Sequence, residues 1–337
     1  MRFVRSAFLL SLLCSWSSAL LAEPGELPAL GIDPARVSVS GLSSGGFMAA
    51  QYSVTYSASV MGAAIVAGGP FNCAPINGPL LFLAICMSGR PSGAKSWKSA
   101  SSFARAGVID PVQGIKRQRI YLFSGSRDGV VAPAVVKSLL SFYRKAGVPP
   151  ANLLYVNAMP AGHAFISSRI GNADCSANTG PYIDQCSVGT ELYDQPGAIL
   201  SHVYGTLRPT APALSAQPQA FHEDDYTSPF AAMASIGYVY VPAACRPASA
   251  HCALHVVFHG CSQSASVVGD DVYGKLGYNQ WADSNGIVIL YPQVDASPVN
   301  PMGCWDWWGY TGFDFLLRHG AQMAAVSAMI ARLEKPH

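Results

Sequence analysis

The sequence has few charged residues. Lys, Arg, Asp and Glu make up 12% of its 337 residues, against about 25% in an average soluble protein. There are 21 basic and 19 acidic residues, and loss of residues 1–22 would remove two arginines and leave the chain formally neutral. A chain without excess positive charge is not expected to bind nucleic acid. A surface with little charge suits contact with an apolar solid, although secreted enzymes in general often have little charge.

Long apolar segments are missing after residue 22. At the N-terminus, Arg2 and Arg5 precede an apolar run at residues 7–16, and a stretch with small residues ends at Ala22. The run is shorter than the ~20 residues that span a bilayer, and the three parts have the order of a secretory signal peptide cleaved after Ala22. A membrane anchor and a lipid-anchored Cys14 are the alternatives. We expect the remaining chain to be exported and soluble, either extracellular or periplasmic, with no stable membrane insertion.

The sequence contains no Cys-x-x-Cys pair, so the usual pattern of a zinc site is missing. Eight of the nine cysteines lie after residue 22. An even number in an exported chain predicts disulfides, although the sequence does not determine their connectivity. Short loops favour Cys175 with Cys186 and Cys245 with Cys252. The pairs that then remain are Cys73 with Cys86 and Cys261 with Cys304.

Short β-rich segments alternate with longer segments of helical period. This pattern is typical of a mostly parallel sheet covered by helices on both faces. We expect strands at residues 36–40, 62–67, 118–123, 152–157, 236–242, 254–258 and 287–291. We expect helices at residues 45–55, 95–106, 132–145, 193–207, 275–284 and 312–333. Residues 208–228 are rich in Pro, Ala, Ser and Gln and are expected to form a loop; with no internal repeat, a single α/β domain at residues 23–337 is predicted.

A nucleophile motif follows the first expected strand. Residues 41–46 read GLSSGG, and a helical segment follows directly. This is G-x-S-x-G in its strand–turn–helix context, where glycines let strand and helix pack closely and the helix N-terminus faces a developing oxyanion. The motif predicts Ser43 as nucleophile and the backbone N–H of Ser44 as an oxyanion donor. A Gly/Ser turn that matches by chance is the alternative.

A serine hydroxyl needs a histidine to take its proton and a carboxylate to orient that histidine. Asp128 follows the strand expected at residues 118–123, and His163 lies in a glycine-containing loop after the strand expected at residues 152–157. The chain order Ser, Asp, His is that of α/β-hydrolases. The alternatives are that Asp128 merely caps the next helix, or that Asp110 is the acid.

The second oxyanion donor is expected in a His-Gly loop that follows a strand. The matching segment, VVFHGCSQ at residues 256–263, makes the backbone N–H of Cys261 this donor. We expect His259 to be structural. Metal binding by His259 together with His255 or His251 is the alternative.

The position of this loop in the chain is unusual, because it lies far downstream of Ser43. A circular permutation would explain it. The helix expected at residues 312–333 would, in an unpermuted relative, lead into residues 31–34 and the nucleophile strand. Such a rearrangement is tolerated when the chain ends lie close together.

Six blocks of the sequence together resemble the esterase family of poly(3-hydroxybutyrate) depolymerases. They are GLSSGG, SRDGVV, AGHAF, VVFHGCSQ, GYNQWADSNGIVILYPQ and GCWDWWGY. Their order is similar to that of the circularly permuted, single-domain, fungal-type enzymes, and the similarity covers nearly all of the chain after residue 22. The resemblance implies an α/β-hydrolase fold. It also implies a triad and two oxyanion donors at Ser43, Asp128, His163, Ser44 and Cys261.

One block departs from the family pattern. Where the family has Cys-Trp-Asn-Trp, residues 304–307 read Cys-Trp-Asp-Trp, so Asp306 replaces an asparagine. The aromatic residues of this block either line a crevice for a polyester backbone or belong to the core. Trp307 and Trp305 are the substrate-contact candidates, and the resemblance favours Trp307.

These residues predict a serine esterase that cleaves poly(3-hydroxybutyrate) or a related aliphatic polyester through an acyl-enzyme. The mechanism needs no metal or organic cofactor, and we expect a monomer. An exported esterase for small or carbohydrate-linked esters, of feruloyl or acetyl type, is the first alternative. A polymer-binding protein without catalytic activity is the second.

Overall fold

The computed structural model describes residues 23–247 and 249–336. The expected signal peptide and Cys14 lie outside the described residues. Among the described helices, none has the length and apolar character that crossing a bilayer requires.

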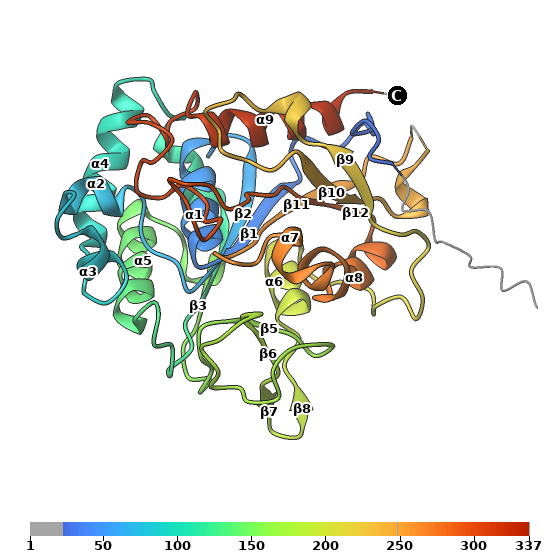
Figure 1. Ribbon diagram of the computed structural model, residues 1–337, viewed down its shortest axis with the longest axis horizontal. Helices are drawn as coiled ribbons and strands as arrows, with labels where there is room; N and C mark the ends of the chain where they lie inside the picture. The colour runs from blue at the N-terminus through green and yellow to red at the C-terminus, as the bar shows by residue number, and fades with distance from the viewer. Residues whose placement is uncertain (1–22, 248, 337) are drawn as a thin grey trace, which may run out of the picture.

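The described chain is built around an eight-stranded sheet with the order β4-β3-β2-β1-β11-β12-β10-β9 (Figure 1). The six strands from β4 to β12 are parallel, whereas β10 runs antiparallel to β12 and β9 antiparallel to β10. The expectation of a mostly parallel α/β-hydrolase sheet is therefore confirmed. The strands are β1 (Val37–Leu42), β2 (Val60–Val66), β3 (Arg119–Phe123), β4 (Leu153–Val156), β9 (Gln219–His222), β10 (Ile236–Tyr240), β11 (Ala253–Phe258) and β12 (Ile287–Tyr291).

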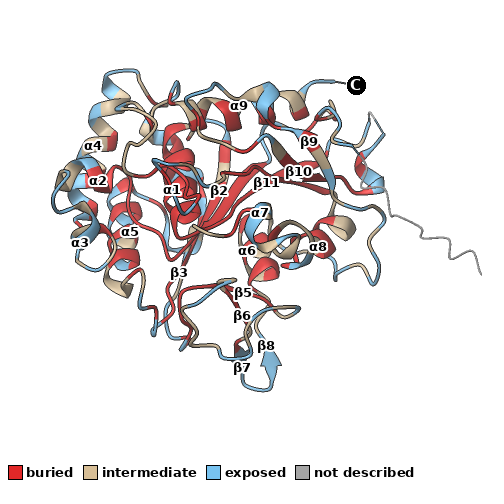
Figure 2. Cartoon of the chain, in the orientation of Figure 1, coloured by how far each residue is buried: buried red, intermediate tan, exposed pale blue. Residues whose placement is uncertain are grey.

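Helices cover both faces of the sheet, and each face has its own apolar cluster. One cluster joins alternate strand residues to α1 (Ser44–Thr55), α4 (Gly93–Arg105), α5 (Pro133–Ala146) and α9 (Ala321–Glu334). The other joins the opposite strand residues to α6 (Gln195–Tyr204) and α8 (Tyr278–Asn285). Successive side chains of a strand point to opposite faces, so the central strands are buried on both sides (Figure 2).

Shorter elements lie around the sheet. Four small strands form two separate pairs at the bottom of Figure 1. The remaining elements are α2 (Cys73–Asn77), α3 (Phe82–Cys86), β5 (Phe165–Ile166), β6 (Ile183–Asp184), β7 (Ser187–Val188), β8 (Glu191–Leu192), α7 (Ala265–Val268), the 3₁₀ turns Val112–Arg117, Pro150–Asn152, Asp224–Tyr226 and Ala243–Cys245, and the π-helical turn Asp271–Lys275.

Three expectations about the elements need correction. The last helix begins at Ala321 instead of residue 312, because residues 312–320 form successive turns that carry two glycines. The segment at residues 208–228 is not only loop, since β9 extends the sheet by pairing with β10. The short helices α2 and α3 were not expected, because five residues carry little helical periodicity.

The two segments that a circular permutation would join lie side by side. The backbone N–H of Leu30 donates to the carbonyl of Leu333 (3.1 Å), and that of Gly31 donates to Lys335 (2.9 Å). The end of α9 therefore lies against the segment that leads into β1. The late strand β11 is the direct neighbour of β1, with Val37 opposite Leu254.

Four disulfides close loops around the sheet, and they are the two pairs that short loops favour and the two pairs that then remain. They join Cys73 to Cys86, Cys175 to Cys186, Cys245 to Cys252, and Cys261 to Cys304.

Candidate active site

Ser43 occupies the sharp turn between β1 and α1. Its backbone has φ 56° and ψ −120°, a positive φ that is uncommon for a residue with a side chain and typical of a strained nucleophile turn. The N–H of Ser43 donates to the carbonyl of Val66 (2.9 Å), and its carbonyl accepts from Phe47 (2.9 Å). The turn is therefore fixed both to the neighbouring strand β2 and to the first turn of α1.

Glycine is required on the α1 side of this turn. A Cβ on Gly45 would collide with the carbonyl oxygens of Phe258 and His259, and a Cβ on Gly41 would collide with the carbonyl of Gly45. The missing side chains let α1 approach β1 and the end of β11 together. The glycines of the motif thus bring the turn at Ser43 close to the loop that follows β11.

Asp128 and His163 stand on the loops after β3 and β4 and contact each other directly. The His163 Nδ1 lies 2.9 Å from Asp128 Oδ2 and 3.1 Å from Oδ1. Asp128 Oδ1 also accepts from the N–H groups of Val130 (2.9 Å) and Val131 (2.8 Å). Both side chains are buried. The rival acid, Asp110, instead pairs with Arg318 (2.9 Å).

The loop after β11 lies beside the turn at Ser43. Ser44 and Cys261 both line the cavity that contains Ser43. The loop is held by the N–H of Ser262, which donates to the carbonyl of Met302 (2.7 Å), and by the disulfide between Cys261 and Cys304.

His259 and His255 are both engaged in hydrogen bonds inside the core. His259 Nε2 accepts from the N–H of Val294 (3.0 Å), so its Nδ1 carries the proton and donates to the carbonyl of Gly260 (2.7 Å). Burial lowers the pKa of His259 to about 4 and that of His255 to about 3. Among the described residues, no group of three or more His, Cys, Asp or Glu side chains is arranged to hold a metal ion.

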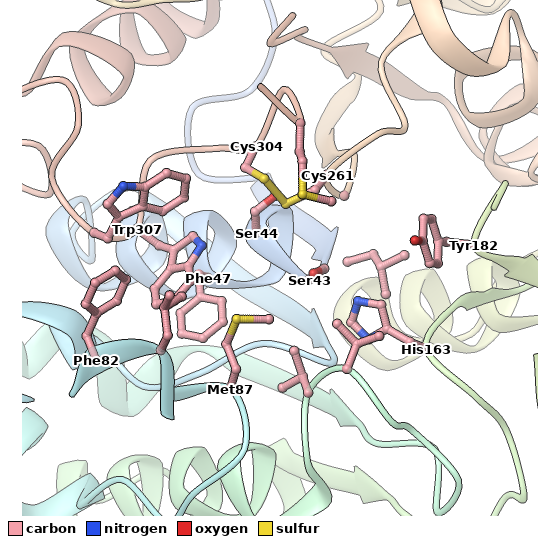
Figure 3. A pocket seen from close by; sticks show the side chains of 17 residues that line it. Ser43, Ser44, Phe47, Phe82, Met87, His163, Tyr182, Cys261, Cys304 and Trp307 are labelled. Carbon is pink, nitrogen blue, oxygen red and sulfur yellow. A yellow bond between two sulfur atoms is a disulfide. The ribbon is translucent and has the colours of Figure 1, made fainter. Parts of the chain in front are cut away.

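These elements surround a cavity of about 330 Å³ (Figure 3). The Ser43 hydroxyl and the His163 ring both project into it. No hydrogen bond joins these two described side chains; the bond between a nucleophile and its base often tightens only when substrate binds. The lining is almost wholly apolar and consists of Leu42, Ser43, Ser44, Phe47, Phe82, Leu83, Met87, Val130, Val131, His163, Tyr182, Gly260, Cys261, Met302, Cys304, Trp307 and Trp308.

An aromatic group forms one wall of the cavity. Trp307 stacks on Phe47, with ring centroids 4.4 Å apart, and meets the edge of Phe82 at 5.6 Å. Trp308 lies beside Trp307 and also lines the cavity. Trp305 does not: it is fully buried and packs edge-on against Phe258, so its selection as a substrate contact is wrong.

Asn178 and Phe82 lie outside the sequence motifs of this site, and Gln263, the last residue of VVFHGCSQ, had no role assigned from the sequence. Asn178 bonds to the backbone of both loops that hold Asp128 and His163, and Gln263 accepts from the N–H of Gly260 (2.7 Å). Phe82 comes from the unexpected helix α3. The signal that indicates Asn178 is contact between distant segments, which a single sequence does not display.

Two curated relatives match nearly the whole chain. A poly(3-hydroxybutyrate) depolymerase of Delftia acidovorans is 41% identical over 315 residues, which are 91% of this chain and 61% of the relative. A polyhydroxybutyrate depolymerase of Talaromyces funiculosus is 36% identical over 323 residues, which are 91% of this chain and 92% of the relative. This chain belongs to the polyhydroxybutyrate depolymerase family. The resemblance of the six sequence blocks is confirmed, and the expected class of carboxylic ester hydrolase follows from the membership.

Solved structures of depolymerases agree with this placement. A PHB depolymerase from Penicillium funiculosum superimposes with a TM-score of 0.84 at 36% identity, covering 92% of this chain and 98% of that one. A variant PHB depolymerase complexed with an R3HB trimer gives the same TM-score at 35% identity and the same coverage. No protein-family model matches the chain. The chain spans less than two thirds of the length of the Delftia depolymerase.

The departure from the depolymerase motif at Asp306 has a local explanation. Its carboxylate accepts from the N–H groups of Trp308 (3.1 Å), Gly309 (2.6 Å), Tyr310 (3.2 Å) and Thr311 (2.8 Å), and from the Thr311 hydroxyl (2.7 Å). Two carboxylate oxygens satisfy these donors, whereas an amide would turn an NH₂ group toward some of them. Burial raises the pKa of Asp306, and its hydrogen bonds oppose that rise.

Proposed function

We propose that this chain is an exported serine esterase that hydrolyses poly(3-hydroxybutyrate) or its oligomers through Ser43, His163 and Asp128. The observation that carries the proposal is that His163, paired with the buried Asp128, lines one apolar cavity together with a serine in a strained strand–helix turn. The names of both curated relatives support the substrate class.

In the proposed reaction, His163 Nε2 takes the proton of Ser43 as its oxygen attacks an ester carbonyl. Asp128 holds the Nδ1–H of the imidazole and stabilises the imidazolium. His163 then gives its proton to the leaving hydroxyl as the ester C–O bond breaks. Water attacks the acyl-enzyme with the same histidine as base, which releases a hydroxy acid and restores Ser43.

The negative charge on the carbonyl oxygen needs donors that are already in place. The N–H groups of Ser44 and Cys261 are proposed for this role because both residues line the cavity beside Ser43. Ser44 also lies at the N-terminus of α1, where the helix dipole favours negative charge. Loss of one such donor typically costs about 3 kcal/mol of transition-state stabilisation.

The lining and rim of the cavity support an apolar polymer as substrate. The aromatic wall around Trp307 offers area to the methyl-bearing backbone of the polyester. At the rim, Leu83 and Met302 are 55% and 52% exposed although they are apolar. Exposed apolar groups beside a cavity suit contact with an insoluble surface.

Export and domain organisation are part of the proposal. The four disulfides support an oxidising compartment, because disulfides are rare in the reducing cytosol. The continuous sheet from β4 to β9 supports one catalytic domain after residue 22.

The deciding experiment compares wild type with Ser43→Ala on a polyester film and on p-nitrophenyl butyrate. We expect a loss of about 10⁴-fold or more in kcat on both substrates, and loss of labelling by a fluorophosphonate probe. Ser53→Ala is the matched control, since Ser53 is a buried serine of α1 whose hydroxyl bonds to Ala50. Hydrolysis by Ser43→Ala at the wild-type rate would refute the proposal. Hydrolysis of the soluble ester without clearing of the film would point to small esters.

A further inference from the structure

Asn178 joins the two loops that carry the proposed acid and base. Its Oδ1 accepts from the N–H of Gly129 (2.8 Å) and from the N–H of His163 (3.0 Å). Its Nδ2 donates to the carbonyls of Arg127 (3.2 Å) and Ser176 (3.0 Å). One side chain therefore bonds to the backbone on both sides of Asp128 and to the backbone of His163 itself.

The orientation of this amide is determined by its partners. Gly129 and His163 present N–H groups and therefore require an oxygen, whereas Arg127 and Ser176 present carbonyls and require the NH₂ group. All four hydrogen-bonding positions of the amide are used. A rotation that exchanged its oxygen and nitrogen would place donor against donor and acceptor against acceptor.

Little else ties these loops together near the reacting groups. The N–H of Arg127 donates to the carbonyl of Ala161 (3.0 Å), and that of Ser126 donates to Met159 (2.8 Å). Both bonds lie before the acid and the base in their loops. Past them, the hydrogen bonds between the loops among the described residues are those of the Asp128–His163 pair and of the bridge through Asn178.

The segment that carries Asn178 is itself anchored. The N–H of Gly162 donates to the carbonyl of Cys175 (2.8 Å), and Cys175 is joined to Cys186 by a disulfide. A Cβ on Gly162 would collide with the carbonyl of Ala177, so this segment lies directly on the histidine loop. Asn178 is thus held against the loop from outside the sheet.

We propose that Asn178 is a positioning residue of the esterase reaction, setting the separation of the two loops and with it the distance between the Asp128 carboxylate and the His163 ring. This inference rests on the proposed function of Ser43, His163 and Asp128. Asn178 does not line the cavity, so it acts through the backbone of its partners.

The test compares Asn178→Ala and Asn178→Asp with matched variants of Asn285. Asn285 is likewise half-buried and bridges two segments: its Oδ1 accepts from the N–H of Arg208 (2.8 Å) and its Nδ2 donates to the Arg208 carbonyl (3.1 Å). It lies outside the cavity lining. The readouts are kcat and KM on p-nitrophenyl butyrate, the pH profile of kcat/KM, and the melting temperature.

We expect Asn178→Ala to lower kcat by about 10- to 100-fold, because displacement of a catalytic group by 1 Å has effects of this size. KM should stay within about twofold, since ground-state binding is untouched. Asn285→Ala should keep the wild-type kcat even if its melting temperature falls as far as that of Asn178→Ala. If Asn178→Ala does not fold, the aspartate variant, which retains an acceptor oxygen, carries the test.

Asn178→Asp gives a signature that a structural role alone would not give. The variant keeps the acceptor for Gly129 and His163, although its second oxygen replaces the donor to the carbonyls of Arg127 and Ser176. Its new negative charge should favour the imidazolium and move the acidic limb of kcat/KM to higher pH. The other ionisable groups around the ring, Asp128, Tyr182 and Asp184, stay the same in this variant, as does Arg127, which precedes Asp128 in the chain.

Two results would overturn the inference: a kcat within about twofold of wild type in Asn178→Ala, or an unmoved acidic limb in Asn178→Asp. Both are distinct from failure of the proposed function. If Ser43→Ala is inert while the Asn178 variants behave like those of Asn285, only the role of Asn178 is refuted. If Ser43→Ala hydrolyses the ester, the triad itself is refuted.

Discussion

The two sides of the cavity are built in different ways. Ser43, Ser44 and Cys261 form what we call the sheet-held side, since they follow β1 and β11, which pair directly in the middle of the sheet. Asp128 and His163 form the loop-held side. They stand on loops after β3 and β4, toward one edge of the sheet, and are positioned by hydrogen bonds from side chains to backbone.

This difference predicts different sensitivities. Backbone hydrogen bonds repeat along a pair of strands, so the sheet-held side should tolerate many side-chain changes. It should lose activity and stability when a new side chain crowds the backbone. The loop-held side depends on a few individual atoms. It should lose rate after isosteric changes that leave the fold intact.

The largest effect is expected from Asp128→Asn. Asp128 Oδ1 faces two N–H groups, from Val130 and Val131, so an asparagine must keep its oxygen there and turn its NH₂ toward His163 Nδ1. The histidine would then carry its proton on Nε2 and could not accept one from Ser43. We expect kcat to fall by about 10⁴-fold with little change in melting temperature. Asp110→Asn is the control. An equal loss of kcat in both variants would contradict the distinction between Asp128 and Asp110.

Crowding of the sheet-held side should come next. Gly45→Ala places a methyl group against the carbonyls of Phe258 and His259, which belong to main chain that cannot move aside freely. We expect about 100-fold lower activity together with a lower melting temperature. Gly25→Ala is the control, because nothing lies within 4 Å of a Cβ there. Normal stability and rate in Gly45→Ala would show that strand pairing is not what holds this side.

The aromatic wall should show a smaller effect, confined to binding. Trp307→Ala removes the ring that stacks on Phe47 and should raise KM for oligomers by about 10-fold, with kcat less affected. Trp305→Phe is the control, since Trp305 is fully buried and does not line the cavity. Equal changes in KM for both variants would mean that the stacked ring is not a substrate contact.

The smallest effect concerns stability near the loop-held side. Burial raises the pKa of Asp184 to about 6; its Oδ1 accepts from Asn172 (2.9 Å), whereas its buried Oδ2 has no hydrogen-bond partner among the described residues. Between the pKa of about 3.9 in the unfolded chain and the higher folded value, the Asp184 carboxyl ionises in the unfolded chain but stays protonated in the folded one. The free energy of unfolding therefore falls as the pH rises through this window. Above about pH 6 the penalty is complete.

Asp184→Asn removes this titration. The difference in free energy of unfolding between variant and wild type should therefore grow in favour of the variant by about 1–3 kcal/mol from pH 4 to pH 7. Urea denaturation at several pH values measures it. A difference that is constant with pH would contradict the assignment to Asp184.

The sequence predicted the sheet-held side better than the loop-held side. The strand at residues 287–291 was predicted with its observed bounds, and the strand–turn–helix geometry around Ser43 was predicted from GLSSGG. These features are local, because strand periodicity and the requirement for glycine act over a few residues. Asn178 was missed, since its partners Gly129 and Arg127 lie 49 and 51 positions away.

The aromatic block shows the same limit. Trp305 and Trp307 are two positions apart and chemically alike, yet one is in the core and the other lines the cavity. Residues 304–306 have no regular secondary structure, so no period assigns them to a face. What decides is tertiary packing: Trp305 meets Phe258, whereas Trp307 meets Phe47.

The pairing of β1 with β11 has a consequence for how the molecule matures. Ser38 on β1 and His255 on β11 are in contact although 217 positions separate them. While the chain is being made or translocated, β1 can pair with β2 at once, but its other edge stays open until just over three quarters of the polypeptide has emerged. Pairings this distant form slowly, and an open strand edge invites association between molecules. Catalytic competence should therefore arrive as one of the last events of folding, and newly made chains should be most prone to aggregate just before it.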